Sequence, residues 1–168
     1  MKVKTIYESV SEVDNQGNEL SPEQVEFFKD SKVRDYSGKL LLCYHTSPVE
    51  GITEFKNGFF TDDANATTHF PGKPYKCYLN ITNPFVYDAD YNEYDNLEYN
   101  GEIVSADDIV YDIMKNHSQY DGVIIRDVDE QGTGGMFAMT DYIPFGPEQI
   151  KSITNKNPTN SKNINENT

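Results

Sequence analysis

The chain has 168 residues, a length typical of one domain with its own core, to which twelve Tyr and nine Phe can contribute. Its 28 Asp and Glu residues outnumber its 14 Lys and Arg residues, and the formal net charge of −14 argues against a surface that follows nucleic-acid phosphates. No stretch approaches the ~18 apolar residues of a membrane span. We therefore expect neither a membrane nor a nucleic acid among its partners.

The N-terminal part of the sequence contains one clear helix signal. Residues 1–18 are polar and weakly patterned, and we expect them to form a flexible segment. Ser21 then suits a helix N-cap, Pro22 the first helical position and Gln24 the closing position of a capping box, so a short helix is predicted. The next elements are expected to be strands at 40–44, 58–61 and 75–81, with a helical turn over 62–70.

Two cysteines, Cys43 and Cys77, fall within predicted strands. Their spacing fits neither a metal site nor a disulfide framework. We interpret them as reduced core residues of a cytoplasmic protein.

The C-terminal half is predicted to carry the centre of the sheet. Residues 82–102 are acidic and rich in Tyr, which indicates an exposed insertion. Ser105 and Asp108 form a second capping box, for a helix that ends near residue 116. The later elements are expected to be a central strand at 120–128, extended segments at 136–139 and 141–145, and a turn and strand at 147–153.

Short strands with few helices predict a compact α+β domain, which we place at residues 19–155. Asn, Lys, Thr and Ser dominate the end of the chain. We therefore expect residues 156–168 to form a disordered polar tail.

Two polar side chains stand where apolar strands end or begin. His45 follows the strand at 40–44, and a neutral imidazole there can donate a hydrogen bond to a ligand hydroxyl. Asp141 opens the run "DYIPF", and a carboxylate in a cleft can hold a sugar hydroxyl or stabilise an oxocarbenium ion. The residues alone leave both roles open, because a histidine at a strand end is often structural and a carboxylate there is often solvated.

The stretch "GFFTDDANATTHF" supplies the aromatic groups of the same candidate site. Alternation along a strand puts Phe59 and Phe60 on opposite faces, so one can face the core while the other lines a cleft. Thr67 lies one helical turn before Phe70, and its hydroxyl can share that face. Two aromatic planes can hold a flat heterocycle, although these phenylalanines also suit a core.

An ordered set of motifs resembles a known family. The stretch "LSPEQVEFFKDSKVRDYSGKLL" precedes a Tyr-His strand, and "GFFTDD", "YDGVI" and "PEQIKSI" follow it. In this order they resemble the ADP-ribosyltransferase-like domains of phage and mobile-element polyvalent proteins, within the His-Tyr-Glu branch that includes diphtheria toxin and the poly(ADP-ribose) polymerases. The resemblance covers roughly residues 19–160. It implies a split pair of small antiparallel sheets, with few short helices, around an NAD cleft.

The resemblance also implies roles for individual residues in binding NAD. His45 would hydrogen-bond a ribose hydroxyl, and the backbone of Thr46, where the family usually has Gly, would bind the nicotinamide carboxamide. Phe59 and Phe70 would sandwich the nicotinamide ring, and the Thr67 hydroxyl would bond the carboxamide.

The catalytic acid and the acceptor loop follow from the same resemblance. Asp141 takes the place of the branch's Glu, which stabilises the positive charge that develops on the ribose. No metal is implied. The loop before this strand lies where the fold usually contacts its acceptor, which points to Gln131, Gly134, Gly135, Met136 and Phe137.

Two functions remain open from the sequence. The first is mono-ADP-ribosyl transfer from NAD to a macromolecule of a bacterial host, with protein as the expected acceptor and the host cytoplasm as the location. The second is a non-catalytic binding module, which the substitutions at Thr46, Phe59 and Asp141 favour. An RNA 2′-phosphotransferase would require phosphate-binding basic residues, and an arginine-type transferase would require a Glu-x-Glu pair where this chain has "TDYIPF".

Overall fold

The computed structural model describes residues 11–56, 58–65 and 72–165, and it shows an α+β domain with few short helices, as the sequence predicts. Within these ranges, no helix combines the length and apolar character needed to cross a membrane. The helices are α2 (Pro22–Phe27), α3 (Ala106–Asn116) and the 3₁₀-helix η2 (Pro147–Gln149). The strands are β1 (Cys43–Ser47), β2 (Phe60–Thr61), β3 (Lys73–Leu79), β4 (Pro84–Asp88), β5 (Leu97–Tyr99), β6 (Glu102–Val104), β7 (Gly122–Val128), β8 (Met139–Pro144) and β9 (Ile150–Ser152).

Both predicted capping boxes are present. The Ser21 hydroxyl accepts from the backbone N–H of Gln24 at 3.0 Å, and the Gln24 side chain accepts from the backbone N–H of Ser21 at 2.9 Å. Ser105 and Asp108 make the same exchange at the start of α3. Because these bonds satisfy backbone groups that a helix leaves free at its N-terminus, they explain why each helix begins where the sequence indicates.

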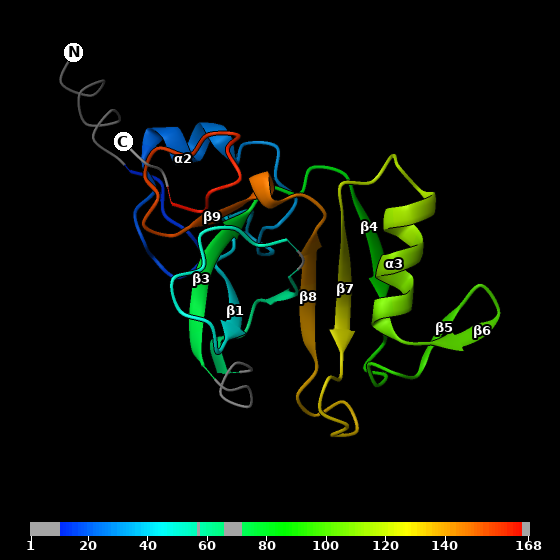
Figure 1. The fold of residues 1–168 in the computed structure, drawn as a ribbon. Coiled ribbons are helices and arrows are strands. Elements are labelled where there is room, and N and C mark those ends of the chain that lie inside the picture. The colour runs from blue at the N-terminus through cyan, green and yellow to red at the C-terminus, as the bar shows by residue number, and fades with distance from the viewer. Residues whose placement is uncertain (1–10, 57, 66–71, 166–168) are drawn as a thin grey trace, which may run out of the picture.

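Among the described residues, the main sheet has seven strands in the order β4-β7-β8-β2-β1-β3-β9. It consists of two groups, β4-β7-β8 and β1-β3-β9, and the two-residue strand β2 pairs with a member of each. The groups lie apart in Figure 1, and α3 packs on the first of them. The expected split pair of small sheets is therefore present as two halves of one sheet. The named strand pairs in it are antiparallel except for β4 and β7, which are parallel.

The prediction of an exposed insertion at 82–102 was wrong. This segment contributes β4 to the main sheet, through parallel pairing with β7. It also places Ala89 and Leu97 in a buried cluster with α3 and β7, where they are 1% and 0% exposed. The few apolar positions are separated by acidic residues, so they do not form a recognisable strand pattern. Parallel pairing to a distant strand also leaves no local sequence signal.

The two extended segments expected after residue 135 also differ from the structure. A single strand, β8, begins at Met139, whereas Met136 and Phe137 lie in the preceding loop with 76% and 59% of their surfaces exposed. Gly134 and Gly135 have positive φ angles of 71° and 86°, which turn the chain just before these residues. Glycine adopts this conformation without steric cost, so the apolar residues after it are held out of the sheet.

The structure corrects the expectation of a flexible segment for residues 11–18, whereas residues 1–10 lie outside the described ranges. Asp14 is fully buried and accepts hydrogen bonds from the Tyr78 hydroxyl at 2.6 Å and from the backbone N–H groups of Gln16 and Asn18. A buried carboxylate is tolerated where it accepts several such bonds. The polar character of this segment therefore reflects a structured loop.

The polar tail is ordered as far as residue 165, contrary to the expectation of disorder from 156. Ile164 is 2% exposed and packs in the main core, and its backbone N–H donates to the carbonyl of Thr53 at 2.8 Å. The buried Lys151 ammonium donates to the carbonyls of Ser161 and Asn163 at 2.7 and 3.1 Å. The tail is therefore held by backbone groups, which composition does not reveal.

Cys43 and Cys77 are register partners on β1 and β3, and both carry free, buried thiols. Burial raises the pKa of each thiol, so both remain in the unreactive protonated form. This agrees with their predicted place in the core.

Replacement of Ile164 by alanine should lower the free energy of unfolding by roughly 2–5 kcal/mol, the usual cost of removing a fully buried Ile side chain. Ile103→Ala is the matched control, because Ile103 is 64% exposed and its truncation should change stability by less than ~0.5 kcal/mol. Urea unfolding of the two variants measures both values. Equal stability would show that the tail does not pack on the core.

Candidate functional site

The strands that carry the predicted site residues are neighbours in the sheet. Tyr44 on β1 is the register partner of Thr61 on β2, and Thr61 is in turn the partner of Asp141 on β8. His45 follows Tyr44, and Phe59 immediately precedes β2. Three segments that are distant in sequence thus meet at the junction between the two halves of the sheet.

His45 is oriented by the segment that leads into β2. Its Nδ1 lies 2.8 Å from the carbonyl oxygen of Phe59, and because a carbonyl can only accept, Nδ1 carries the hydrogen. The ring packs against Phe55 and Phe60, with centroid distances of 5.2 and 5.3 Å. In the neutral imidazole, Nε2 is therefore left as the hydrogen-bond acceptor.

Thr46 occupies a position where the resemblance expects glycine, and its backbone does not need glycine. Its φ angle is outside the positive region, and it pairs with Pro74 in the regular ladder between β1 and β3. Among the described residues, its buried hydroxyl has no hydrogen-bond partner. The threonine therefore places an unsatisfied polar atom beside His45 without straining the chain.

Phe59 and Phe60 lie on opposite faces of the chain, as the alternation predicts. Phe60 is fully buried in the core that includes Ile124 and Tyr142. Phe59 is half-buried against Tyr94, at a centroid distance of 6.1 Å, and it lines a cavity of about 430 Å³ between α3 and the end of β8. Phe59 is thus the aromatic residue of the pair that remains available to a ligand.

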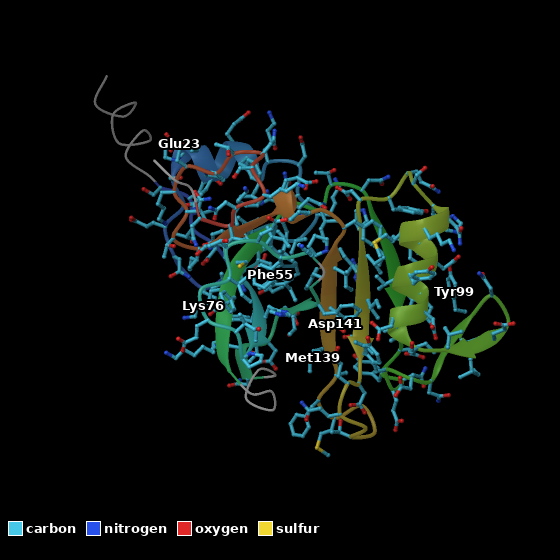
Figure 2. All side chains as sticks on the ribbon, viewed as in Figure 1. Glu23, Phe55, Lys76, Tyr99, Met139 and Asp141 are labelled. Carbon is cyan, nitrogen blue, oxygen red and sulfur yellow. The ribbon has the colours of Figure 1, made fainter. Side chains whose placement is uncertain are left out.

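Asp141 is a buried carboxylate in the middle of the domain (Figure 2). It is 1% exposed, and within the described part of the chain neither of its oxygens has a hydrogen-bond partner. Burial, followed by the Glu130 carboxyl group and the charge of Asp62, raises the pKa of Asp141 well above its usual range. A buried, unsatisfied carboxyl group is costly, so a native structure that keeps one points to a functional role.

The His45 ring and the Asp141 carboxylate approach the junction from different sides. His45 contacts Phe60, whereas Asp141 is the register partner of Thr61, and successive residues of a strand point to opposite faces. The structure therefore brings His45, Phe59 and Asp141 to adjacent segments, with only Phe59 and Asp141 on the same face of β2. Thr67 and Phe70 lie outside the described residues.

Three residues that affect or surround Asp141 were not predicted from the sequence as site residues. Glu130 follows the buried end of β7, Asp62 follows β2, and Tyr94 belongs to the segment interpreted as an insertion. Asp62 accepts from the backbone N–H of Thr140 at 3.3 Å, and burial raises its pKa. The "GFFTDD" motif contained Asp62, but no local pattern indicated that Glu130 contributes to the raised pKa of Asp141.

The predicted acceptor loop is built around Asp129. This buried carboxylate accepts from the backbone N–H groups of Gln131, Thr133 and Gly135 at 3.1, 2.6 and 3.0 Å. Burial acts to raise the pKa of Asp129, but these hydrogen bonds outweigh it and the pKa lies below its ordinary value. The base of the loop is therefore fixed, while Met136 at its tip remains exposed.

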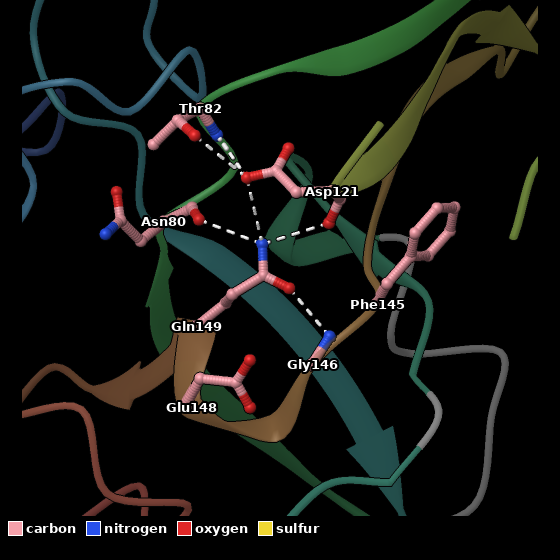
Figure 3. A pocket seen from close by; sticks show the side chains of 7 residues that line it. All are labelled: Asn80, Thr82, Asp121, Phe145, Gly146, Glu148 and Gln149. Carbon is pink, nitrogen blue, oxygen red and sulfur yellow. Dashed lines mark hydrogen bonds between the residues drawn. The ribbon is translucent and has the colours of Figure 1, made fainter. Parts of the chain in front are cut away.

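The "PEQIKSI" motif is structural, as predicted. The Gln149 amide donates to the carbonyls of Asn80 and Asp121, both at 3.0 Å, and accepts from the backbone N–H of Gly146 (Figure 3). The Asp121 carboxylate also accepts from the backbone N–H groups of Thr82 and Asn83 at 2.8 Å. These bonds join the ends of β3, β7 and β8. The pocket drawn in Figure 3 is therefore lined by residues that hold these strand ends together.

Within the described ranges, no group of three or more His, Cys, Asp or Glu side chains is placed to hold a metal ion.

Asp141→Asn should stabilise the protein at neutral pH. Because the folded pKa of Asp141 lies above its unfolded value of 3.8, the folded state binds more protons, and stability falls as pH rises from about 4 towards the folded pKa. Each unit of difference in pKa is worth about 1.4 kcal/mol of stability, or ~3–6 °C in Tm. Thermal unfolding should therefore show a higher Tm for the variant at pH 7, with a gap that closes towards pH 4.

The control for this measurement is Asp121→Asn, which removes a carboxylate that accepts hydrogen bonds from Thr82 and Asn83. It should lower Tm. If Asp141→Asn lowered Tm as well, Asp141 would be a structural carboxylate.

One comparison with known proteins identifies a family for this chain. A family model described as ADP-ribosyltransferase in polyvalent proteins matches residues 35–160, a range that contains β1, β2 and β8 and the residues placed at their junction. No curated protein and no solved structure matches the chain. Since the matched range covers more than half of the sequence, the chain belongs to the family of ADP-ribosyltransferases found in polyvalent proteins.

Proposed function

We propose that this protein transfers ADP-ribose from NAD to a macromolecule of a bacterial host, with protein as the acceptor class. Membership of the ADP-ribosyltransferase family supports the reaction type. The observation that carries the proposal is the Asp141 carboxyl group, which is buried at the junction of the sheet halves and, among the described residues, has no partner for either oxygen.

This carboxyl group suits the chemistry of ribosyl transfer. When the bond between ribose C1′ and the nicotinamide nitrogen breaks, nicotinamide leaves with the electron pair and positive charge grows on the ribose. A fixed carboxylate in a dry site stabilises such charge more strongly than one in water. A nucleophilic atom of the acceptor then bonds to C1′ and loses its proton.

The neighbouring residues have binding roles in this proposal. The Nε2 atom of His45, which is left free to accept, would bond a ribose hydroxyl. The backbone of Thr46 would bond the nicotinamide carboxamide, and Phe59 would pack on the ring. Thr67 and Phe70, the other proposed contacts, lie outside the described residues.

The loop at 129–137 would contact the acceptor. Its base is held by Asp129, and its tip presents the exposed side chains of Met136 and Phe137. Exposed apolar groups on a rigid base are typical of surfaces that bind proteins. Gln131, Gly134 and Gly135 complete the proposed acceptor loop.

A binding module without catalysis is the second candidate. Two observations favour it: Asp141 is one methylene shorter than the Glu of the branch, and the His45 ring packs on the opposite face of β2 from Asp141. In this case the NAD pocket would recognise a ligand without breaking its glycosidic bond. The host cytoplasm would be the location for either function.

Asp141→Ala should abolish the transfer of labelled ADP-ribose from NAD to proteins of a bacterial lysate. Loss of one electrostatic contact to a transition state typically costs ~10²–10³ in rate, while ground-state affinity changes less. Asp141→Glu is the matched variant, and it should retain or raise activity because it keeps the charge and lengthens its reach. If the wild type and both variants cleave and transfer nothing in lysates from several hosts, the binding module replaces the enzyme.

Phe59→Ala should weaken NAD binding several-fold, since aromatic pairs contribute roughly 0.5–1.5 kcal/mol beyond the area they bury. Isothermal calorimetry gives the affinities directly. Tyr36→Ala serves as the control, because Tyr36 is fully exposed on a distant turn and its loss should leave the affinity unchanged. Equal affinities of Phe59→Ala and the wild type would exclude ring stacking on Phe59.

A further inference from the structure

We propose that Tyr91, Met136 and Phe137 form one docking surface, and that it binds an acceptor protein whose own apolar patch is surrounded by Lys and Arg. The inference rests on the proposed function and deepens it. It adds Tyr91, from the segment after β4, to the acceptor loop at 129–137, and it names the chemistry of the acceptor. Strand β8, which carries Asp141, begins shortly after this loop.

The acceptor loop and the segment after β4 are joined through their backbones. Because β4 and β7 are parallel, the chain leaves both strands at the same end of the sheet (Figure 1). The backbone N–H of Tyr91 donates to the carbonyl of Asp127 at 2.8 Å, and that of Asp129 donates to the carbonyl of Asn92 at 2.9 Å. A Cβ atom on Gly135 would lie 3.0 Å from the Cβ of Tyr91, so the loop packs directly against this residue.

Tyr91 has an unusual backbone conformation for a large side chain. Asp90 and Tyr91 are the central residues of a turn that is closed by the N–H of Asn92, which donates to the carbonyl of Ala89 at 2.9 Å. Their φ angles are 49° and 65°, and such turns normally contain Gly, Asn or Asp at both positions. The Tyr91 side chain is 56% exposed, so packing within the protein does not offset the strain. A strained, exposed aromatic residue is better explained by contact with another molecule.

Met136 and Phe137 extend this apolar surface. Both side chains are mostly exposed, yet the backbone beneath them is held in place. The N–H of Phe137 donates to the Thr133 hydroxyl at 3.1 Å, and this hydroxyl donates to the buried Asp129 carboxylate at 3.1 Å. Aromatic residues and Met are enriched at protein interfaces, and a preorganised backbone reduces the entropy lost on binding.

Negative charge surrounds the apolar side chains. Asp90 lies in the same turn as the tyrosine, Glu130 lies in the loop, and a Cβ on Gly132 would lie 3.8 Å from the Glu93 carboxylate. The basic residue of the two segments is Arg126, whose register partner is the aspartate that ends β4. Such a surface repels nucleic-acid phosphates and attracts Lys and Arg. The acceptor that fits it is therefore a protein surface with basic residues around an apolar centre.

The surface can be tested without NAD, by fluorescence anisotropy with three labelled synthetic peptides. The first consists of Lys and Leu repeats, the second has Glu in place of Lys, and the third has Ser in place of Leu. The Lys/Leu peptide should bind the wild-type protein, and its affinity should fall as salt is added. The Glu/Leu peptide should not bind, and the Lys/Ser peptide should bind several-fold more weakly. Equal affinities for the Lys/Leu and Lys/Ser peptides would overturn the apolar surface.

Variants locate the binding on the protein. Tyr91→Gly should weaken binding of the Lys/Leu peptide several-fold without lowering Tm, because glycine suits the positive φ. Glu93→Gln should weaken it and reduce its dependence on salt. The matched controls are Tyr36→Ala and Glu102→Gln, which alter an exposed aromatic residue and an exposed carboxylate elsewhere and should leave the affinity unchanged. Unchanged affinity in Tyr91→Gly, or a lower Tm, would overturn the role of Tyr91.

A second measurement links the surface to transfer. With labelled NAD and a bacterial lysate, C1′ of the ribose is attacked either by an acceptor atom or by water, and nicotinamide leaves in both cases. Tyr91→Gly should lower the ratio of ADP-ribose transferred to protein to ADP-ribose released by hydrolysis, because water requires no docking surface. An unchanged ratio would overturn the link to the acceptor. If the wild type cleaves no NAD, the proposed function fails, while the peptide measurements still decide whether the docking surface exists.

Discussion

Two residues, Phe60 and Thr61, join the halves of this domain, and the placement of the candidate site depends on them. Thr61 pairs with Tyr44 on one side and Asp141 on the other, so it sets the spacing between β1 and β8. Phe60 is fully buried and packs against residues of both halves. A strand of two residues contributes few hydrogen bonds, so the junction also relies on the packing of Phe60 and on the hydrogen bond between His45 and the carbonyl of Phe59.

The buried polar groups of the protein fall into two classes. Asp14, Gln24, Asp129 and Lys151 each make several hydrogen bonds to backbone groups, and each holds a loop, a helix start or the tail in place. Asp141 is as deeply buried but has none from the residues described. Since a satisfied polar network stabilises a fold and an unsatisfied group destabilises it, the burial of Asp141 does not contribute to stability, which is why the proposed function is built on this residue.

Asp141 lies among groups that disfavour its ionised form. Its register partners are Thr61 and Ile125, and burial, the carboxyl group of Glu130 and the charge of Asp62 all raise its pKa. The β-bulge between Ile125 and Val128, with Asp127 at a φ of 52°, interrupts the ladder beside Asp141. The strained backbone and the unsatisfied carboxylate thus occur together.

The sequence by itself determined the elements whose signals are local. Both capping boxes, the strand at 122–128 and the structural turn at 147–149 follow from residues within a few positions of each other. The ordered motifs also indicated the family and the positions of His45, Phe59 and Asp141.

Only the tertiary structure decided the features that depend on distant partners. Strand β4 belongs to the sheet through parallel pairing with β7. The Lys151 ammonium donates hydrogen bonds to carbonyl groups of the tail, and Ile164 packs in the core. The burial of Asp141 likewise depends on the pairing of β8 with β2 and β7, which come from distant parts of the chain. Hydrogen bonds to backbone atoms and the burial of a single acidic residue carry no composition signal, because any residue supplies the backbone partner and an acidic residue, taken alone, is typical of an exposed loop.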